Sequence, residues 1–294
     1  MLSPELFAKI RYIDITTSRL VDSVFAGEYH SVFKGKGMEF DEVREYVPGD
    51  DVRDIDWNVT AKTGHPHTKR FIEERELTVF ILIDVSGSEY FGSQEHSKAE
   101  IIAQICALLA FSAIKNNDRV GVLFFSDQVE KFILPKKGKR HVLRVIREIL
   151  TFKPKHQGTS INAALRALNE ILPKKSIVFL MSDFLTKDYE TLLKITHKKH
   201  DVIAVVVEDS REIDFPNIGY IELEDVESKQ RVILNSGNRR FRQKYLELNE
   251  TRRRDRTKLF ASIRMDHIEI RSDKSYTQSL IQFFKSRAKK VGRN

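Results

Sequence analysis

The chain has almost no cysteine: among its 294 residues the only one is Cys106. A single thiol cannot form a disulfide within the chain, nor build a metal site from several cysteines. Such low cysteine use is typical of proteins from a reducing compartment. The length is nevertheless sufficient to bury a sizeable core.

A long uninterrupted hydrophobic run is also missing. The most apolar stretch, 99–114, is shorter than the roughly 20 residues of a membrane-spanning helix and contains Glu100, Gln104 and Ser112. The start of the chain, MLSPELFAKIRYID, has neither the apolar centre nor the cleavage site of a signal peptide. We therefore expect a cytoplasmic protein without a transmembrane segment.

Three catalytic or nucleotide-binding motifs are absent. The sequence has no Gly-x-x-x-x-Gly-Lys-Ser/Thr loop for ATP phosphates. The Gly-x-Ser-x-Gly elbow of serine hydrolases fails around Ser86, because Asp84 and Ser88 occupy the glycine positions. A phosphatase of the haloacid-dehalogenase type needs a second carboxylate where Ser86 stands. These absences favour a non-enzymatic protein.

The charge balance is basic, with a formal net charge of +8. That balance is compatible with acidic partners but identifies none. The arginine-rich segment 239–256 suggests nucleic-acid binding, but Glu247, Glu250 and Asp255 are interleaved with its arginines. This mixture favours a solvated helix face, and we expect no specific nucleic-acid partner.

Four apolar runs end in polar side chains: 79–84, 120–127, 177–183 and 202–209. Continuous apolarity is typical of strands covered on both faces of a parallel sheet. Helical patterns follow or separate them at 99–114, 139–150, 160–172 and 189–199. This alternation predicts a three-layer, Rossmann-like α/β fold.

One connection is too short for a parallel crossover. Only Asp127 and Gln128 separate Ser126 from the next apolar run, 129–134, so these two strands must be antiparallel. The sheet is therefore mixed, with one antiparallel strand near an edge. A second hairpin is expected from 220–223 and 231–234, then a helix over 238–260, a strand near 267–270 and a helix from 275.

The first part of the chain is different. A short helix at 4–13 precedes a charged, glycine-containing stretch, in which Gly64, His65 and Pro66 are expected to join strands at 55–61 and 68–72. We predict an N-terminal charged appendage, 1–75, packed on a main domain, 76–294, with Trp57 in a core.

Oxygen-bearing side chains gather where the predicted strands end. Asp84, Ser86 and Ser88 follow the first strand, Thr159 stands at the start of a helix, and Asp183 ends another strand. Because ligands of open α/β sheets bind at these strand ends, the five side chains could hold Mg²⁺ or Mn²⁺, with Ca²⁺ as a further candidate. Taken singly, Thr159 could instead cap its helix and the aspartates could accept loop amides.

The order of these residues resembles the metal-ion-dependent adhesion site of von Willebrand factor A domains, which also have the antiparallel strand. The resemblance implies that Ser86, Ser88 and Thr159 contact the metal and that Asp84 and Asp183 act largely through water. Neutral hydroxyl ligands leave most of the charge of the ion uncompensated. Such a site is suited to binding a carboxylate of a partner protein.

The segment GKGMEFDEVREYVPGDDVRDIDWNVTAKTG, 35–64, resembles the bacterial domain-of-unknown-function family fifty-eight. Its members are typically encoded beside MoxR-type AAA+ ATPases. The resemblance implies an adaptor or scaffold whose partner is such an ATPase or its client. Within this segment Arg44, Asp50, Arg53 and Asp56 are candidate partner-binding residues.

A metal-dependent nuclease, or a nucleic-acid-binding protein, is the alternative. The acids of the charged segment could form a two-metal site, and its bases could contact phosphate; the acids are Asp50, Asp51, Asp54, Asp56, Glu73 and Glu74. The same charges could equally pair with each other and have a purely structural role.

Overall fold

The structure, a computed structural model, describes residues 4–33, 39–72, 76–86, 98–156, 158–213, 217–224 and 231–291. The chain forms two compact units: the larger combines Met1–Val32 with Thr78–Asn294, and the smaller is Phe33–Leu77. This division differs from the expected one at 75/76, because the first helices belong to the larger unit.

A six-stranded sheet is the centre of the larger unit, in the order β10-β7-β6-β3-β4-β5. Its strands are β3 (Thr78–Asp84), β4 (Arg119–Phe125), β5 (Val129–Lys136), β6 (Ile177–Ser182), β7 (Asp201–Glu208) and β10 (Asp266–Arg271). All neighbours are parallel except β5, which runs antiparallel to β4 at the edge. The predicted parallel strands and the short antiparallel hairpin are thus confirmed.

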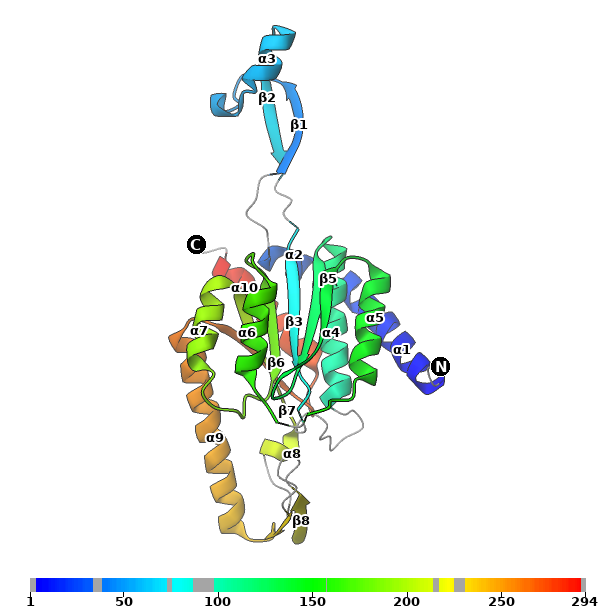
Figure 1. Cartoon of the computed structure of the whole chain (residues 1–294), viewed down its shortest axis with the longest axis vertical. Helices are drawn as coiled ribbons and strands as arrows, with labels where there is room; N and C mark the ends of the chain where they lie inside the picture. Colours follow the sequence, from blue (N-terminus) through cyan, green and yellow to red (C-terminus); the bar gives the residue numbers. More distant parts are fainter. Residues whose placement is uncertain are drawn as a thin grey trace. The chain divides into compact units, whose positions relative to one another are not determined.

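Helices cover both faces of this sheet (Figure 1). The helices that follow the first strand of this unit are α4 (Lys98–Lys115), α5 (Lys139–Thr151), α6 (Ile161–Ile171), α7 (Glu190–Lys199), α8 (Ser210–Ile213), α9 (Arg239–Ser262) and α10 (Tyr276–Val291). Helices α6, α7 and the end of α9 pack on one face through residues such as Leu165, Leu193 and Phe260. Helix α4 is almost wholly buried on the other face, as its continuous apolarity indicates. The three-layer α/β arrangement agrees with the sequence prediction.

The N-terminal helix is longer than predicted. Instead of ending near residue 13, it runs as α1 (Pro4–Leu20), continues through a π-helical turn (Val21–Phe25) and ends with α2 (Ala26–Val32). Asp14 pairs with Lys139 of α5 at 2.9 Å, and the Tyr29 hydroxyl donates to Asp118 at 3.0 Å. These contacts make the segment part of the helical layer beside α4 and α5.

The smaller unit contains an antiparallel pair, β1 (Glu39–Glu45) and β2 (His67–Ile72), a 3₁₀ turn (Val52–Asp54) and α3 (Trp57–Thr63). The strand predicted at 55–61 is wrong, since Asp56 accepts the backbone N–H groups of Asn58 and Val59 and thereby starts a helix. The prediction that Trp57 belongs to a core is also wrong, because its side chain is 66% exposed.

The second predicted hairpin is present as a separate two-stranded sheet, β8 (Tyr220–Glu224) with β9 (Arg231–Asn235), directly before α9. In Figure 1, β8 lies beside the start of α9. No helix within the described residues is long and apolar enough to cross a membrane.

Candidate functional site

Two buried aspartates lie at the ends of neighbouring parallel strands. Asp84 is the last residue of β3, and Asp183 directly follows β6, which pairs with β3 along its length. Both side chains are almost inaccessible to solvent. The pairing of these strands brings together two of the five residues that the sequence identified as candidate metal ligands.

Asp84 is held by hydrogen bonds from both strands. Its Oδ1 accepts the backbone N–H of Ser86 at 3.0 Å, and its Oδ2 accepts the Ser182 hydroxyl at 2.7 Å. Ser182 in turn accepts the backbone N–H of Phe184 at 3.1 Å. Asp84 therefore does accept a loop amide, which is the structural role that the sequence left open for it. Ser182 is an additional site residue, for which the sequence contains no signal.

The carboxyl group of Asp183 is less completely satisfied. Its Oδ1 accepts the N–H of Leu185 at 3.1 Å, whereas its Oδ2 is buried and has no hydrogen-bond partner within the described chain. Burial, and next the negative charge of Asp183, raise the pKa of Asp84 to about 7. Two adjacent buried carboxyls with one unsatisfied oxygen are an arrangement that a cation would stabilise.

Thr159 is not the cap of α6. Ser160 fills that role, because its hydroxyl accepts the N–H of Ala163, and its own N–H is bound to the carbonyl of Ser126 at 2.7 Å. The Thr159 carbonyl accepts the Thr186 hydroxyl at 3.3 Å, which joins it to the loop that begins at Asp183. The hydroxyl of Thr159 is therefore not consumed by helix capping.

The residue types fit a hard cation. Asp84, Ser86, Thr159 and Asp183 offer carboxylate and hydroxyl oxygens, which Mg²⁺, Mn²⁺ and Ca²⁺ prefer. Ser88, the fifth predicted ligand, lies outside the described residues. Within the described ranges no three His, Cys, Asp or Glu side chains are grouped as a metal cluster, so a site here would depend on hydroxyls as well as acids.

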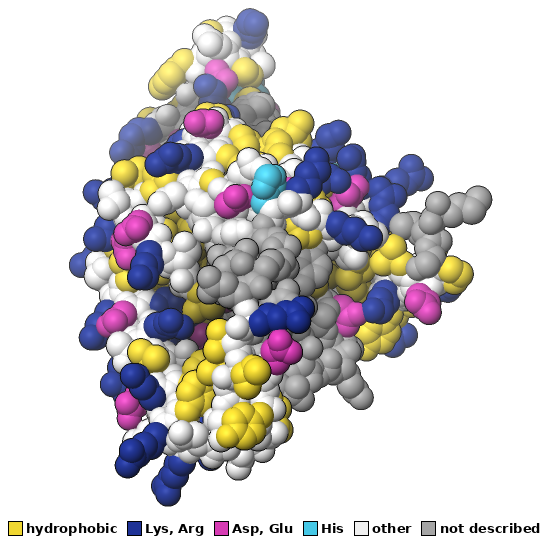
Figure 2. Space-filling view, turned by 60° about the horizontal axis from the view of Figure 1, so that its bottom comes forward, with side chains coloured by type: hydrophobic (Ala, Val, Ile, Leu, Met, Phe, Trp, Pro, Cys, Tyr) yellow, Lys and Arg dark blue, Asp and Glu magenta, His cyan; other side chains and the backbone are white. Residues whose placement is uncertain are grey.

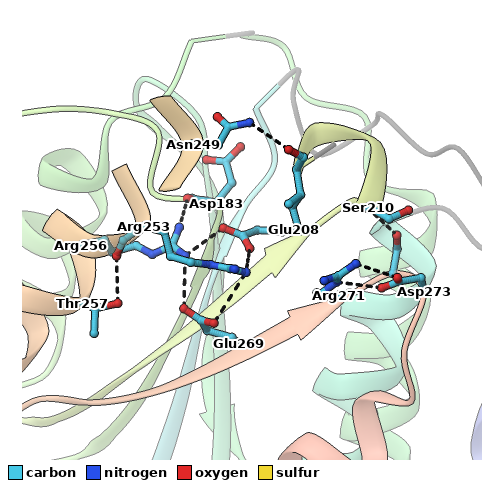
Figure 3. A network of polar contacts seen from close by, with 12 residues as sticks. Asp183, Glu208, Ser210, Asn249, Arg253, Arg256, Thr257, Glu269, Arg271 and Asp273 are labelled. Carbon is cyan, nitrogen blue, oxygen red and sulfur yellow. Dashed lines mark hydrogen bonds and ion pairs between the residues drawn. The ribbon is translucent and has the colours of Figure 1, made fainter. Parts of the chain in front are cut away.

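A buried arginine supports the Asp183 loop from α9 (Figure 3). The Arg256 guanidinium donates to the carbonyl of Asp183 at 3.2 Å and to Oε1 of Glu208 at 2.8 Å, and only 8% of its side chain is exposed. Arg253 donates to the other Glu208 oxygen at 2.9 Å, and both arginines approach Glu269 of β10. The solvated position predicted for the arginines of this helix is wrong for Arg256.

The charges predicted to bind a partner have local partners in the smaller unit. Arg44 pairs with Asp50 at 2.6 Å, and Asp50 also accepts the N–H of Val47 at 3.0 Å. Arg53 pairs with Asp51 at 3.3 Å, and Asp56 pairs with Lys69 at 3.5 Å besides capping α3. These contacts favour the structural role that the sequence left open.

Removing the α3 cap provides a test of that role. In Asp56→Ala, two N–H groups lose their acceptor, and we expect the local stability of α3 to fall. Amide hydrogen exchange of α3 measures the change. Asp54→Ala is the matched control, because the exposed Asp54 side chain has no hydrogen bond in the described structure. If the amides of α3 exchange equally fast in both variants, the Asp56 cap does not stabilise α3.

The nuclease alternative gains no support from these residues. Asp50, Asp51 and Asp56 accept backbone N–H groups and face different basic side chains, and the described residues contain no cluster of three acids. Glu73 and Glu74, the other acids considered, lie outside the described residues.

Relatives of known sequence match the chain over different lengths. The uncharacterized protein Mb1516 of Mycobacterium bovis is 31% identical over 228 residues, which are 76% of this chain and 72% of that protein. The uncharacterized protein YeaD of Bacillus subtilis is 29% identical over 108 residues, 36% of this chain and 25% of its own length.

Among solved structures, the conserved hypothetical protein BatB of Bacteroides thetaiotaomicron is similar with a TM-score of 0.47 and 15% identity, covering 72% of this chain and 99% of that one. Residues 42–255 match the family described as "Protein of unknown function DUF58". The match includes most of the charged segment 35–64, both candidate aspartates and most of α9. The chain belongs to this family.

Proposed function

We propose that this protein is a non-enzymatic, metal-dependent adaptor that binds a carboxylate of a partner protein. The proposed ligands of the divalent cation are Asp84, Ser86, Ser88, Thr159 and Asp183, as in the metal-ion-dependent adhesion site of von Willebrand factor A domains. The observation that carries the proposal is the pair of adjacent buried carboxyls, Asp84 and Asp183, with one oxygen that no described residue hydrogen-bonds.

The surroundings of these carboxyls support recognition more than catalysis. The loop after β3 contributes Ser86 where a second acid would stand in a phosphatase. The hydroxyl of Thr159 is not used for capping, because Ser160 caps α6. When bound, Mg²⁺ or Mn²⁺ would supply positive charge that its neutral hydroxyl ligands leave uncompensated, because the two acids are proposed to act largely through water. The ion would thus have affinity for another carboxylate. The chain itself holds and orients the oxygens, through Ser182 and through Arg256.

The partner that this proposal favours is a MoxR-type AAA+ ATPase or its client, in the assembly or maturation of protein complexes. This part rests on the typical gene neighbourhood of the family. It is tested with the purified ATPase and this chain in Mg²⁺ and in EDTA: metal-dependent binding that Ser88→Ala weakens supports the proposal. Binding that is equal in both buffers would place the contact elsewhere.

Metal binding itself has a direct test. Mg²⁺ at one hundred times its dissociation constant should stabilise the folded chain by about 2.7 kcal/mol, because only the folded state assembles the site. Thermal unfolding in Mg²⁺, Mn²⁺ and EDTA measures this, and Ser86→Ala should reduce the response. Asp255→Asn, on the exposed face of α9, is the control that should respond like wild type. If neither ion shifts the wild-type transition, the site is not a metal site.

A further inference from the structure

The β8–β9 hairpin is unusually exposed for a structured element. Among the side chains of this hairpin and the following turn whose exposure the structure describes, 217–222 and 231–238, the only buried one is that of Ser236. Tyr220, Val232 and Ile233 are all more than half exposed, and Ile233 reaches 72%. Figure 2 shows hydrophobic side chains beside basic ones at the lower end of this face of the molecule.

The base of the hairpin is nevertheless well ordered by hydrogen bonds. Ser236 donates from its N–H and its hydroxyl to the carbonyl of Gly219, at 2.7 and 2.8 Å, and its hydroxyl accepts the N–H of Ile218 at 3.0 Å. Arg242 of α9 donates to the Ser236 carbonyl. The strands are therefore fixed in register while their apolar side chains remain in water.

A two-stranded sheet is marginal by itself, and three or more strands are needed for independent stability. Among the described strands, β8 and β9 pair only with each other, which leaves an open edge on each. An open apolar edge is a template for pairing with another strand. This exposed edge is what a second hairpin could cover.

The two edges differ in whether they are compatible with a copy of themselves. If β8 pairs over its full length with a second β8 in antiparallel fashion, Glu222 faces Glu222 of the copy, and like charges directly opposite are destabilising. If β9 does so, Ile233 faces Ile233 of the copy and Val232 faces Leu234. The ends then place Arg231 opposite Asn235, so no like charges meet.

We propose that β9 is a homodimer interface, at which two copies of this chain pair Arg231–Asn235 in antiparallel register. The two-fold axis passes between the two facing Ile233 residues. The result is a four-stranded sheet in the order β8-β9-β9-β8. Ile233 meets its copy on one face of that sheet, and Val232 meets Leu234 on the other, since side chains alternate along a strand. A self-complementary patch of this kind closes as a dimer and leaves no further β9 edge open.

Cysteine cross-linking tests both the interface and its register. The only native thiol, that of Cys106, is fully buried and its pKa is raised by that burial, so it stays unreactive. In Ile233→Cys the two thiols of a dimer face each other, and mild oxidation should link the chains about a hundredfold faster than random collision at micromolar concentration. Tyr220→Cys on the other strand and Ile195→Cys on α7, which is 55% exposed, are the controls.

The oligomeric state of the unmodified protein provides the second measurement. Sedimentation equilibrium should show a dimer for wild type and for Ile195→Lys, and a shift to monomer for Ile233→Lys, which places a charge on the edge. A wild type that remains monomeric at the highest concentration overturns the proposal. So does a dimer that Ile233→Lys leaves intact, or one in which Ile233→Cys cross-links no faster than Ile195→Cys.

Discussion

Replacing Arg256 with alanine is expected to lower the free energy of unfolding by about 3 kcal/mol, because the change breaks a buried network of ion pairs. The guanidinium is buried and bridges Glu208 of β7, Glu269 of β10 and the carbonyl of Asp183. Its removal leaves the mostly buried Glu208 with only Arg253 to balance its charge. Chemical denaturation monitored by circular dichroism measures the effect.

Two further variants separate charge from geometry. Arg254→Ala, two residues away, removes only an exposed pair with Glu250 and should cost less than about 0.5 kcal/mol. Arg256→Lys keeps the positive charge but loses the planar fork that contacts two strands and a carbonyl at once, so an intermediate loss is expected. An Arg256→Ala variant as stable as Arg254→Ala would show that the network contributes nothing.

Much of the larger unit could be predicted because its strands are buried on both faces. Short apolar runs such as VFILID, which end at a polar residue, are typical of interior strands, and the two residues between Ser126 and Val129 leave room only for a hairpin. The length of the N-terminal helix is underestimated from the sequence because charged residues such as Arg11, Asp14 and Arg19 interrupt its apolar pattern. Only the packing against α4, α5 and α10, where the ring of Phe25 meets that of Phe284, shows that its apolar residues form a buried stripe.

The candidate site was predictable in its residue types but not in their local roles. The sequence places Thr159 and Ser160 side by side, and capping by either is compatible with the pattern, since helix ends shift by a residue or two. Ser182 and Arg256 carry no motif, and their contacts with Asp84 and the Asp183 loop depend on strand order and on the position of α9. In the smaller unit, the pattern around Asp56 predicts a strand. The structure has α3 there instead, because the Asp56 side chain caps the first turn of a helix.

The charge of Asp84 should make the metal-free protein less stable at high pH. Burial, and then the neighbouring Asp183, raise its pKa from 3.8 to about 7, so the folded state holds a proton that the unfolded chain has already lost. Relative to the fully ionised protein, the proton on Asp84 stabilises the folded state by up to about 4 kcal/mol. This contribution is fully present below pH 3.8 and is lost as the pH rises through 7. Unfolding in EDTA at several pH values measures it.

Replacing Asp84 with asparagine should stabilise the metal-free protein, whereas most substitutions of buried residues destabilise it. In Asp84→Asn the amide can still accept from Ser86 and donate to the Ser182 hydroxyl, but it has no charge to oppose Asp183. In EDTA at pH 8 we therefore expect the variant to be more stable than wild type, with little difference near pH 4. Mg²⁺ should stabilise only wild type, and only where Asp84 is ionised, because bound metal competes with the proton. A variant less stable than wild type in EDTA at pH 8 would contradict this, since the carboxylate would then stabilise the fold without an ion. If Asp84→Asn is instead more stable than wild type in EDTA at pH 8, this chain retains a destabilising pair of acids, as expected where stability is traded for binding.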